Sequence, residues 1–161
     1  MPTYPLEVPD HALLEIIWAP RSAVAVTESP FTFSTQAQRH PGQARRVTCK
    51  LPPLNRRRGQ AWSAFFLRLN GREGTFRLGC SIQRFPEGNA LGAPVIDGAS
   101  QIGDTIATRG WHPSLPEALV AGELIQIGDR LHTVLLDTDS NSLGKATLEV
   151  WPRLTTAPAD G

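Results

Sequence analysis

The chain contains little of what marks several common classes of protein. Its 161 residues include two cysteines, Cys49 and Cys80, which are too few for a disulfide framework and lack the spacing of a metal or redox pair. No run approaches the ~20 apolar residues of a membrane helix. The first ten residues have neither the basic region nor the apolar core of a signal peptide. The sequence therefore predicts a protein of the reducing cytosol, with both cysteines as small reduced apolar side chains.

Charge and chemical motifs are equally sparse. Sixteen Lys and Arg against fifteen Asp and Glu give a net charge of +1, which does not favour binding to nucleic acid or to a membrane surface. The four histidines (His11, His40, His112 and His132) have no metal-ligand spacing, and His132 is expected to point outward from its strand. The glycines match neither dinucleotide-binding nor phosphate-binding loops. We therefore expect no catalytic, cofactor-binding or metal-binding residues and no enzymatic activity.

Glycine and proline are plentiful, and they separate short apolar runs. There are 14 of each, and this punctuation is typical of a β-rich fold with many turns. Pro20 and Pro30 are expected to break the early strands, residues 36–42 to form a polar loop, Gly128-Asp129 to form a two-residue turn, and Pro152 to end the last strand. The strands are expected at 13–18, 23–27, 31–35, 44–51, 75–78, 81–84, 104–108, 124–127, 131–136 and 146–151.

The run from Trp62 to Gly79 is the most informative part of the sequence. Asn55 is a suitable N-cap for a helix over 55–69. Asn70-Gly71 provides a stop, because glycine adopts the left-handed conformation without steric cost. Residues 75–78 then alternate polar and apolar, as a half-buried strand does. The helical spacing and this strand together predict a core made of Trp62, Phe65, Phe66, Leu69, Phe76 and Leu78.

These patterns predict a mainly β protein. The expected fold is an antiparallel β-sandwich with one packed α-helix, followed by a small antiparallel sheet or partial barrel. Residues 1–85 are expected to form the first domain and 104–161 the second. The Gly-, Ala- and Pro-rich stretch 86–103 between them is interpreted as a linker or a long surface loop.

Three consecutive arginines, Arg56, Arg57 and Arg58, begin the predicted helix. Positive charge in a first helical turn opposes the helix dipole by roughly 0.3–1 kcal/mol per residue at the surface. Three explanations remain open from the sequence: a solvated cluster, an ion-paired contact with a neighbouring subunit, or a contact with nucleic acid. The lack of interleaved aromatic residues argues against the last.

Two loops are candidates for ligand binding. Asp137, Asp139 and Asn141 imitate the start of a calcium loop, but Ser142 and Leu148 stand where that loop needs glycine and glutamate. A loop rich in turn-forming residues, 137–143, explains them better. Trp111 and Trp151 could instead stack on a sugar, which makes a small carbohydrate- or ligand-binding β module the alternative function.

Two sets of residues carry a resemblance to known proteins. The first set is Pro52-Pro53, Trp62, Phe65, Leu69, Gly71, Gly74 and Phe76, and it resembles the amino-terminal half of tailed-bacteriophage tail-tip proteins. The second set is 92–103, Gly110-Trp111, 121–128, Leu131-His132 and 146–154, and it is similar to proteins encoded in phage and prophage tail modules. The similar segments extend from about residue 44 onward.

The resemblance implies a structural protein of the distal-tail or minor-tail type. In such proteins a β-sandwich carrying one helix assembles as a ring at the end of the tail tube, and a second small β domain decorates the outside. The implied partners are identical subunits, the tail tube protein and the tail hub protein. The implied location is the virion tail, assembled in the cytoplasm of the host bacterium. Arg56, Arg57 and Arg58 are the candidate subunit contacts, with 86–103 as a further candidate.

Overall fold

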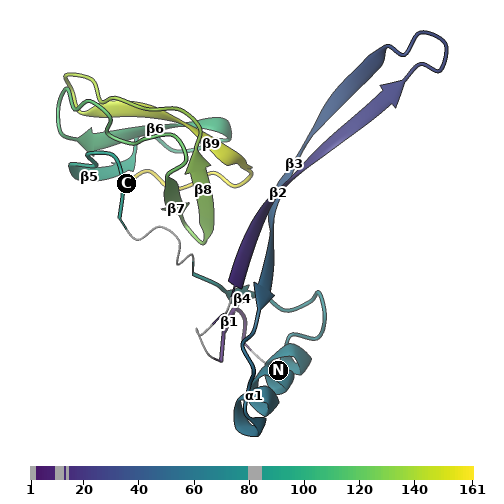
Figure 1. The fold of residues 1–161 in the computed structure, drawn as a ribbon. Coiled ribbons are helices and arrows are strands. Elements are labelled where there is room, and N and C mark those ends of the chain that lie inside the picture. Colours follow the sequence, from purple (N-terminus) through teal and green to yellow (C-terminus); the bar gives the residue numbers. More distant parts are fainter. Residues whose placement is uncertain (1–2, 10–12, 14, 80–84) are drawn as a thin grey trace. The chain divides into compact units, whose positions relative to one another are not determined.

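The computed structural model describes residues 3–9, 13, 15–79 and 85–161, so the expectations for His11, Cys80 and the strand at 81–84 lie outside it. The fold is mainly β with one α-helix, and its sheets are mostly antiparallel (Figure 1). The predicted fold class is therefore confirmed. The elements are β1 Leu6–Glu7, β2 Glu15–Glu28, β3 Thr35–Lys50, α1 Arg56–Arg68, β4 Phe76–Arg77, β5 Gly92–Ile96, β6 Gly103–Trp111, β7 Leu124–Ile127, β8 Arg130–Val134 and β9 Lys145–Leu154.

The chain divides into two compact units. The first comprises Met1–Ala19 and Arg46–Ser81, and the second comprises Pro20–Arg45 and Ile82–Gly161. This grouping places residues 20–45, most of a two-stranded ribbon formed by β2 and β3, with the carboxyl-terminal sheet. The expectation of a linker or long loop over 86–103 is wrong in its middle part, because Gly92–Ile96 forms β5, which pairs antiparallel with β6.

Helix α1 is the centre of the first unit. The side chain of Asn55 accepts a hydrogen bond from the Arg58 backbone N–H at 3.0 Å, which confirms the predicted N-cap. The helix ends through Asn70 and Gly71, both with positive φ (50° and 70°). Beneath the helix lies a two-stranded parallel sheet of β1 and β4. The buried cluster consists of Leu6, Val8, Trp62, Phe65 and Leu69.

The predicted core of this unit is partly wrong. Trp62, Phe65 and Leu69 are buried, but Phe66 is 55% exposed and Phe76 45% exposed, while Leu78 is half-buried. The rings of Phe66 and Phe76 lie 5.5 and 5.6 Å from that of Phe65, in edge-on geometry. The reason is geometric: β4 has only two residues, so the small sheet cannot cover the outer side of these rings.

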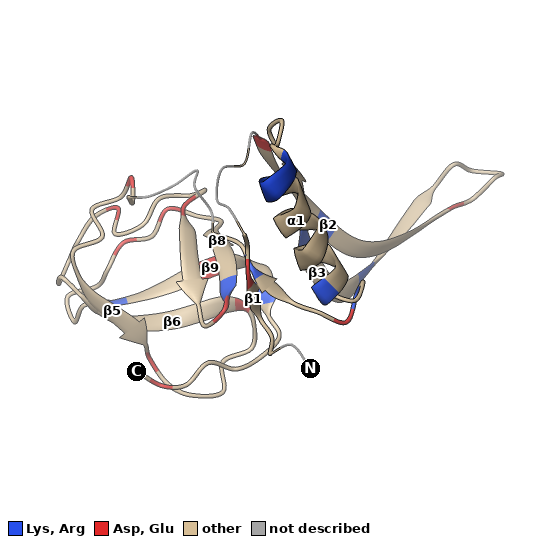
Figure 2. Cartoon of the chain, turned by 90° about the horizontal axis from the view of Figure 1, so that it is seen from below, with Lys and Arg blue, Asp and Glu red and all other residues tan. Residues whose placement is uncertain are grey.

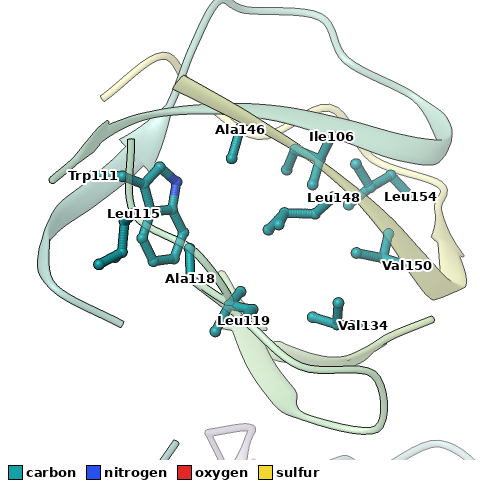
Figure 3. Close-up of a cluster of buried hydrophobic side chains, with 10 residues drawn as sticks. All are labelled: Ile106, Trp111, Leu115, Ala118, Leu119, Val134, Ala146, Leu148, Val150 and Leu154. Carbon is teal, nitrogen blue, oxygen red and sulfur yellow. The ribbon is translucent and has the colours of Figure 1, made fainter. Parts of the chain in front are cut away.

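The second unit contains a five-stranded sheet that curls into a half-barrel. Its strand order is β5-β6-β9-β8-β7, and every neighbouring pair is antiparallel. The predicted two-residue turn at Gly128-Asp129 is confirmed, since Ile127 pairs with Arg130. Figure 3 shows the side chains that converge inside the sheet. They are Ile106, Trp111, Leu115, Ala118, Leu119, Val134, Ala146, Leu148, Val150 and Leu154.

Three predicted breaks in strands are wrong. Pro20 lies within β2, and the expected loop 36–42 lies within β3, whereas the expected strand 31–35 is mostly the turn between them. In a two-stranded ribbon both strands are edges, so a proline can turn its missing donor away from the pairing partner. Pro152 likewise does not end β9, because the register between β6 and β9 shifts beside it and forms a bulge that tolerates proline.

Candidate interaction surfaces

The ribbon of β2 and β3 is exposed over most of its length. From residue 20 to residue 42 every side chain except Ser29 is exposed. Large apolar side chains lie among them: Val26 is 64% exposed, Phe31 92% and Phe33 75%. A pair of strands without a packed face is marginally stable in water. The ribbon therefore has the properties of a surface that another chain covers.

The tip of the ribbon is shaped by its turn and not by packing. The Ser29 N–H donates to the Ser34 carbonyl at 3.0 Å, and the Phe33 N–H donates to the Ser29 carbonyl at 2.9 Å. Phe33 adopts a φ of 54°, which is costly for a bulky aromatic residue. The turn thus presents two aromatic rings to solvent at a defined position. The Phe-x-Phe spacing between polar residues is visible in the sequence, where its alternation predicts a strand at 31–35 and not a turn.

Within the second unit, two side chains of β3 join the ribbon to the half-barrel. A terminal nitrogen of Arg45 (Nη2) donates to the Thr133 hydroxyl and, at 3.2 Å, to the Trp151 carbonyl. The Gln43 side-chain oxygen accepts from the Arg153 backbone N–H at 2.7 Å. Alternation along β3 explains this, because Gln43, Arg45 and Val47 are half-buried on one side while the intervening residues are exposed.

The three arginines lie in the first turn of α1 and are exposed. The first turn contains no acidic residue (Figure 2). Helical geometry places Arg56 and Arg57 on the side opposite the buried Trp62 and Phe65, whereas Arg58 lies on the same side as these buried residues. The same outward side carries Leu67, which is 81% exposed. Arg56 and Arg57 therefore lie on a different side of α1 from Arg58.

The loops at one end of the half-barrel carry several acidic residues (Figure 2). The Asp139 carboxylate accepts from the Glu117 N–H at 2.8 Å, and the Asp137 carboxylate accepts from the Ala121 N–H at 2.8 Å. The Glu117 carbonyl in turn accepts from the Asn89 N–H at 2.8 Å, which brings the segment of Glu87 alongside. These oxygens in the 137–143 loop hold backbone groups, as turn-forming residues do.

An apolar cleft of about 630 Å³ opens in the half-barrel between the edge strands β5 and β7. Its walls include Ile96, Ile125, Ile127 and Leu148. Glu123 lines the cleft but is only 3% exposed. Its carboxylate accepts from the backbone N–H groups of Glu87, Gly88 (2.7 Å) and Val120 (3.1 Å), so it holds two loops together. The sequence reasoning missed this residue, because only its tertiary partners distinguish it from a surface glutamate.

Two titratable groups have shifted pKa values. Hydrogen bonds from Lys145 (2.7 Å) and then from Arg109 (3.1 Å) lower the pKa of Asp97. Burial lowers the pKa of His132, which is 2% exposed. The predicted outward position of His132 is thus wrong, because its ring turns inward and its Nδ1 lies 2.6 Å from the Pro152 carbonyl. In both groups the contacts that accompany the pKa shift belong to the fold, so we assign Asp97 and His132 a structural role.

The two tryptophans of the carbohydrate-binding alternative do not form a stacking surface. Trp111 is 6% exposed within the core, and its indole N–H donates to the Thr108 hydroxyl at 2.8 Å. Trp151 is half-buried, and the Arg45 guanidinium carbon lies 5.2 Å from its ring centroid. Sugar binding needs an open aromatic face, which Trp111 lacks, so we do not propose this function.

Among the described residues, no group of three His, Cys, Asp or Glu side chains could hold a metal ion. Cys49 is a free, exposed cysteine. In the same part of the chain, α1 is too short and too polar to cross a membrane. No protein-family model matches the chain, and a search of curated proteins finds no match.

Proposed function

We propose that this protein is a non-enzymatic structural subunit of a tailed-bacteriophage virion, which forms an oligomeric ring at the distal end of the tail tube. The observation that carries the proposal is the exposed ribbon of β2 and β3, with apolar residues along it and two phenylalanines at its tip. Such a ribbon is suited to assembly and has no evident role in an isolated subunit.

The physical argument concerns unpaired backbone groups. Each strand of the ribbon pairs on one side only within the described residues, so its other side presents N–H and C=O groups to any strand that approaches. A ribbon from an identical subunit can satisfy them and can cover Val24, Val26 and the tip. Repeated head-to-tail, such a contact closes into a ring if the rotation between subunits permits.

The tail assignment is supported by the resemblance in the helical region and the second half of the chain, and by the mainly β fold with one helix that it implies. The proposed partners are identical subunits, the tail tube protein and the tail hub protein. The proposed location is the virion tail, after assembly in the host bacterial cytoplasm. Arg56, Arg57 and Arg58 are the proposed contacts of the helical unit.

Mass photometry and negative-stain microscopy of the purified protein test the proposal. The wild type should form a ring, either alone or when mixed with tail tubes. Phe31→Ser/Phe33→Ser should prevent the ring while the unfolding temperature stays unchanged, because both rings are exposed. Leu143→Ser is the control, since Leu143 is a comparably exposed apolar residue (77%) away from the ribbon. A protein that stays monomeric with and without tail tubes contradicts the proposal.

A further inference from the structure

The charges of this nearly neutral chain are segregated along the sequence. Residues 46–81 contain eight Lys or Arg and one Glu, whereas residues 82–161 contain five Lys or Arg and ten Asp or Glu. These stretches belong to different units. We propose that the outward face of α1 in one subunit docks on the acidic end of the half-barrel in the next subunit. This rests on the proposed self-assembly and names which surfaces meet.

The first surface is the outward face of α1. It is defined by Arg56, Arg57, Gln60, Ser63, Ala64 and Leu67, all of which are exposed. Arginines lie at its start and the most exposed apolar side chain of the helix lies at its end. In the described part of the chain, no ion pair involves Arg56 or Arg57. This face therefore combines positive charge with a large exposed apolar side chain that a partner could contact.

The second surface is the acidic end of the half-barrel. It is defined by Glu87, Glu117, Asp137 and Asp139, whose side chains are exposed and whose segments are tied together by the backbone hydrogen bonds described above. Leu135 (42% exposed) and Leu136 (58%) precede Asp137 directly. Among the described residues, the half-barrel's ion pairs join Arg109 and Lys145 to Asp97 and Arg109 to Asp160, so they leave these four carboxylates to other partners.

The two surfaces are complementary in kind. Each combines two or more like charges with exposed leucine, and the signs are opposite. Carboxylates beside the first turn of α1 would offset both the arginine charges and the positive end of the helix dipole. Leu67 could pack on Leu135 and Leu136, which gives the contact an apolar centre with a charged rim. Because the two surfaces differ, the contact is head-to-tail, the type that generates rings.

Charge reversal on each surface tests the contact. Variant A, Arg56→Glu/Arg57→Glu, carries two acidic surfaces. Variant B, Glu87→Lys/Glu117→Lys, keeps the basic face of α1 and has a half-barrel end on which the two new lysines balance the charges of Asp137 and Asp139. These positions are chosen because no described side-chain hydrogen bond depends on them. Each variant alone should assemble at least about tenfold more weakly than the wild type, because like charges face one another in A and the charge attraction is lost in B. An equal mixture of A and B should recover part of the assembly, because the basic face of B can dock on the unchanged acidic end of A, and the acidic face of A can meet the lysines of B.

Sedimentation velocity measures the assembly of wild type, A, B and their mixture. Gln60→Glu in the wild type is the matched control. It changes the same face by only one charge, so it should weaken assembly less than variant A does. Assembly of A and B should remain weak in about 1 M salt, whereas the wild type should weaken there because the Debye length falls to about 3 Å. A and B that assemble as the wild type does, or a mixture that does not recover, overturn this contact but not the ring. A wild type that never assembles overturns both.

Discussion

The guanidinium group of Arg45 lies over the indole ring of Trp151, with its central carbon 5.2 Å from the ring centroid. The same side chain donates hydrogen bonds to the Thr133 hydroxyl and the Trp151 carbonyl. One residue of β3 thereby holds two neighbouring strands of the half-barrel. If the ribbon assembles as proposed, Arg45 sets the direction in which the ribbon leaves the half-barrel.

Replacing Arg45 by Lys should destabilise the second unit by about 1–2 kcal/mol. Lysine cannot reproduce the planar fork that stacks on the ring and donates twice, and a cation–π contact and a hydrogen bond each contribute of order 1 kcal/mol. Urea unfolding followed by tryptophan fluorescence measures the change. Arg46→Lys is the control, because Arg46 is exposed and should change the free energy of unfolding by less than about 0.5 kcal/mol. Equal effects of both substitutions would contradict this role.

Glu123→Gln should cost about 2–3 kcal/mol. The carboxylate is 3% exposed and accepts three backbone N–H groups, from Glu87, Gly88 and Val120. Glutamine has nearly the same shape but places an NH₂ donor against one or more of these donors and loses the charge. Thermal unfolding measures the loss. Glu117→Gln, an exposed position, should be nearly neutral. A neutral Glu123→Gln would show that the charge of this carboxylate does not stabilise the two loops.

The elements that could be predicted from sequence are those specified by short-range signals. Asn55, the spacing of Trp62, Phe65 and Leu69, and the Gly128-Asp129 turn each act within a few residues, and the structure has them where expected. In the candidate surfaces, the arginines of α1 could be identified because they are consecutive and oppose the helix dipole.

What the sequence could not predict depends on distant partners. Proline breaks a strand only where the pairing needs a backbone N–H at that position, which the neighbouring strand decides. Pro20 and Pro152 therefore lie within strands and do not break them. His132 turns inward because a carbonyl across the sheet is available to it. Glu123 is buried because two loops converge on it. The acidic end of the half-barrel likewise appears only when residues from positions 87 to 139 come together.

His132 should make the protein less stable as the pH falls below 6.5, its ordinary pKa. Burial first, then the charges of Arg45 and Arg130, lower the pKa in the folded state, while the hydrogen bond to the Pro152 carbonyl opposes this. The unfolded state therefore binds the proton more tightly, and stability is lost between pH 6.5 and the lower folded value. The slope is at most about 1.4 kcal/mol per pH unit.

His132→Asn should flatten this dependence, because its amide can still donate to the Pro152 carbonyl but does not titrate. Urea unfolding at a series of pH values from 7.5 downward, spaced by about half a unit, gives the slope for wild type and variant. His40→Asn, on the exposed ribbon, should leave the slope as it is in the wild type. If the slope of His132→Asn equals that of the wild type, another group accounts for the pH dependence.

Gly71 and Gly74, which follow α1, should be intolerant of alanine for different reasons. Gly71 has a φ of 70° with open space around it, so alanine there meets only backbone strain of about 1–2 kcal/mol. A Cβ at Gly74 would lie 2.6 Å from the Leu69 carbonyl oxygen and 2.8 Å from the Leu69 Cα, which are backbone atoms that cannot move aside. The Gly74 N–H also donates to that carbonyl at 2.9 Å, so any displacement breaks the bond that closes the helix end.

Gly74→Ala should therefore cost more than Gly71→Ala in thermal unfolding of the helical unit. The two causes separate with asparagine at position 71, a residue that tolerates left-handed backbone: Gly71→Asn should recover part of the loss. Gly74→Asn should not, because the clash begins at Cβ. Gly79→Ala is the control, since nothing lies within 4 Å of the Cβ it would add. A Gly74→Ala protein as stable as Gly79→Ala would mean that the turn relaxes without cost.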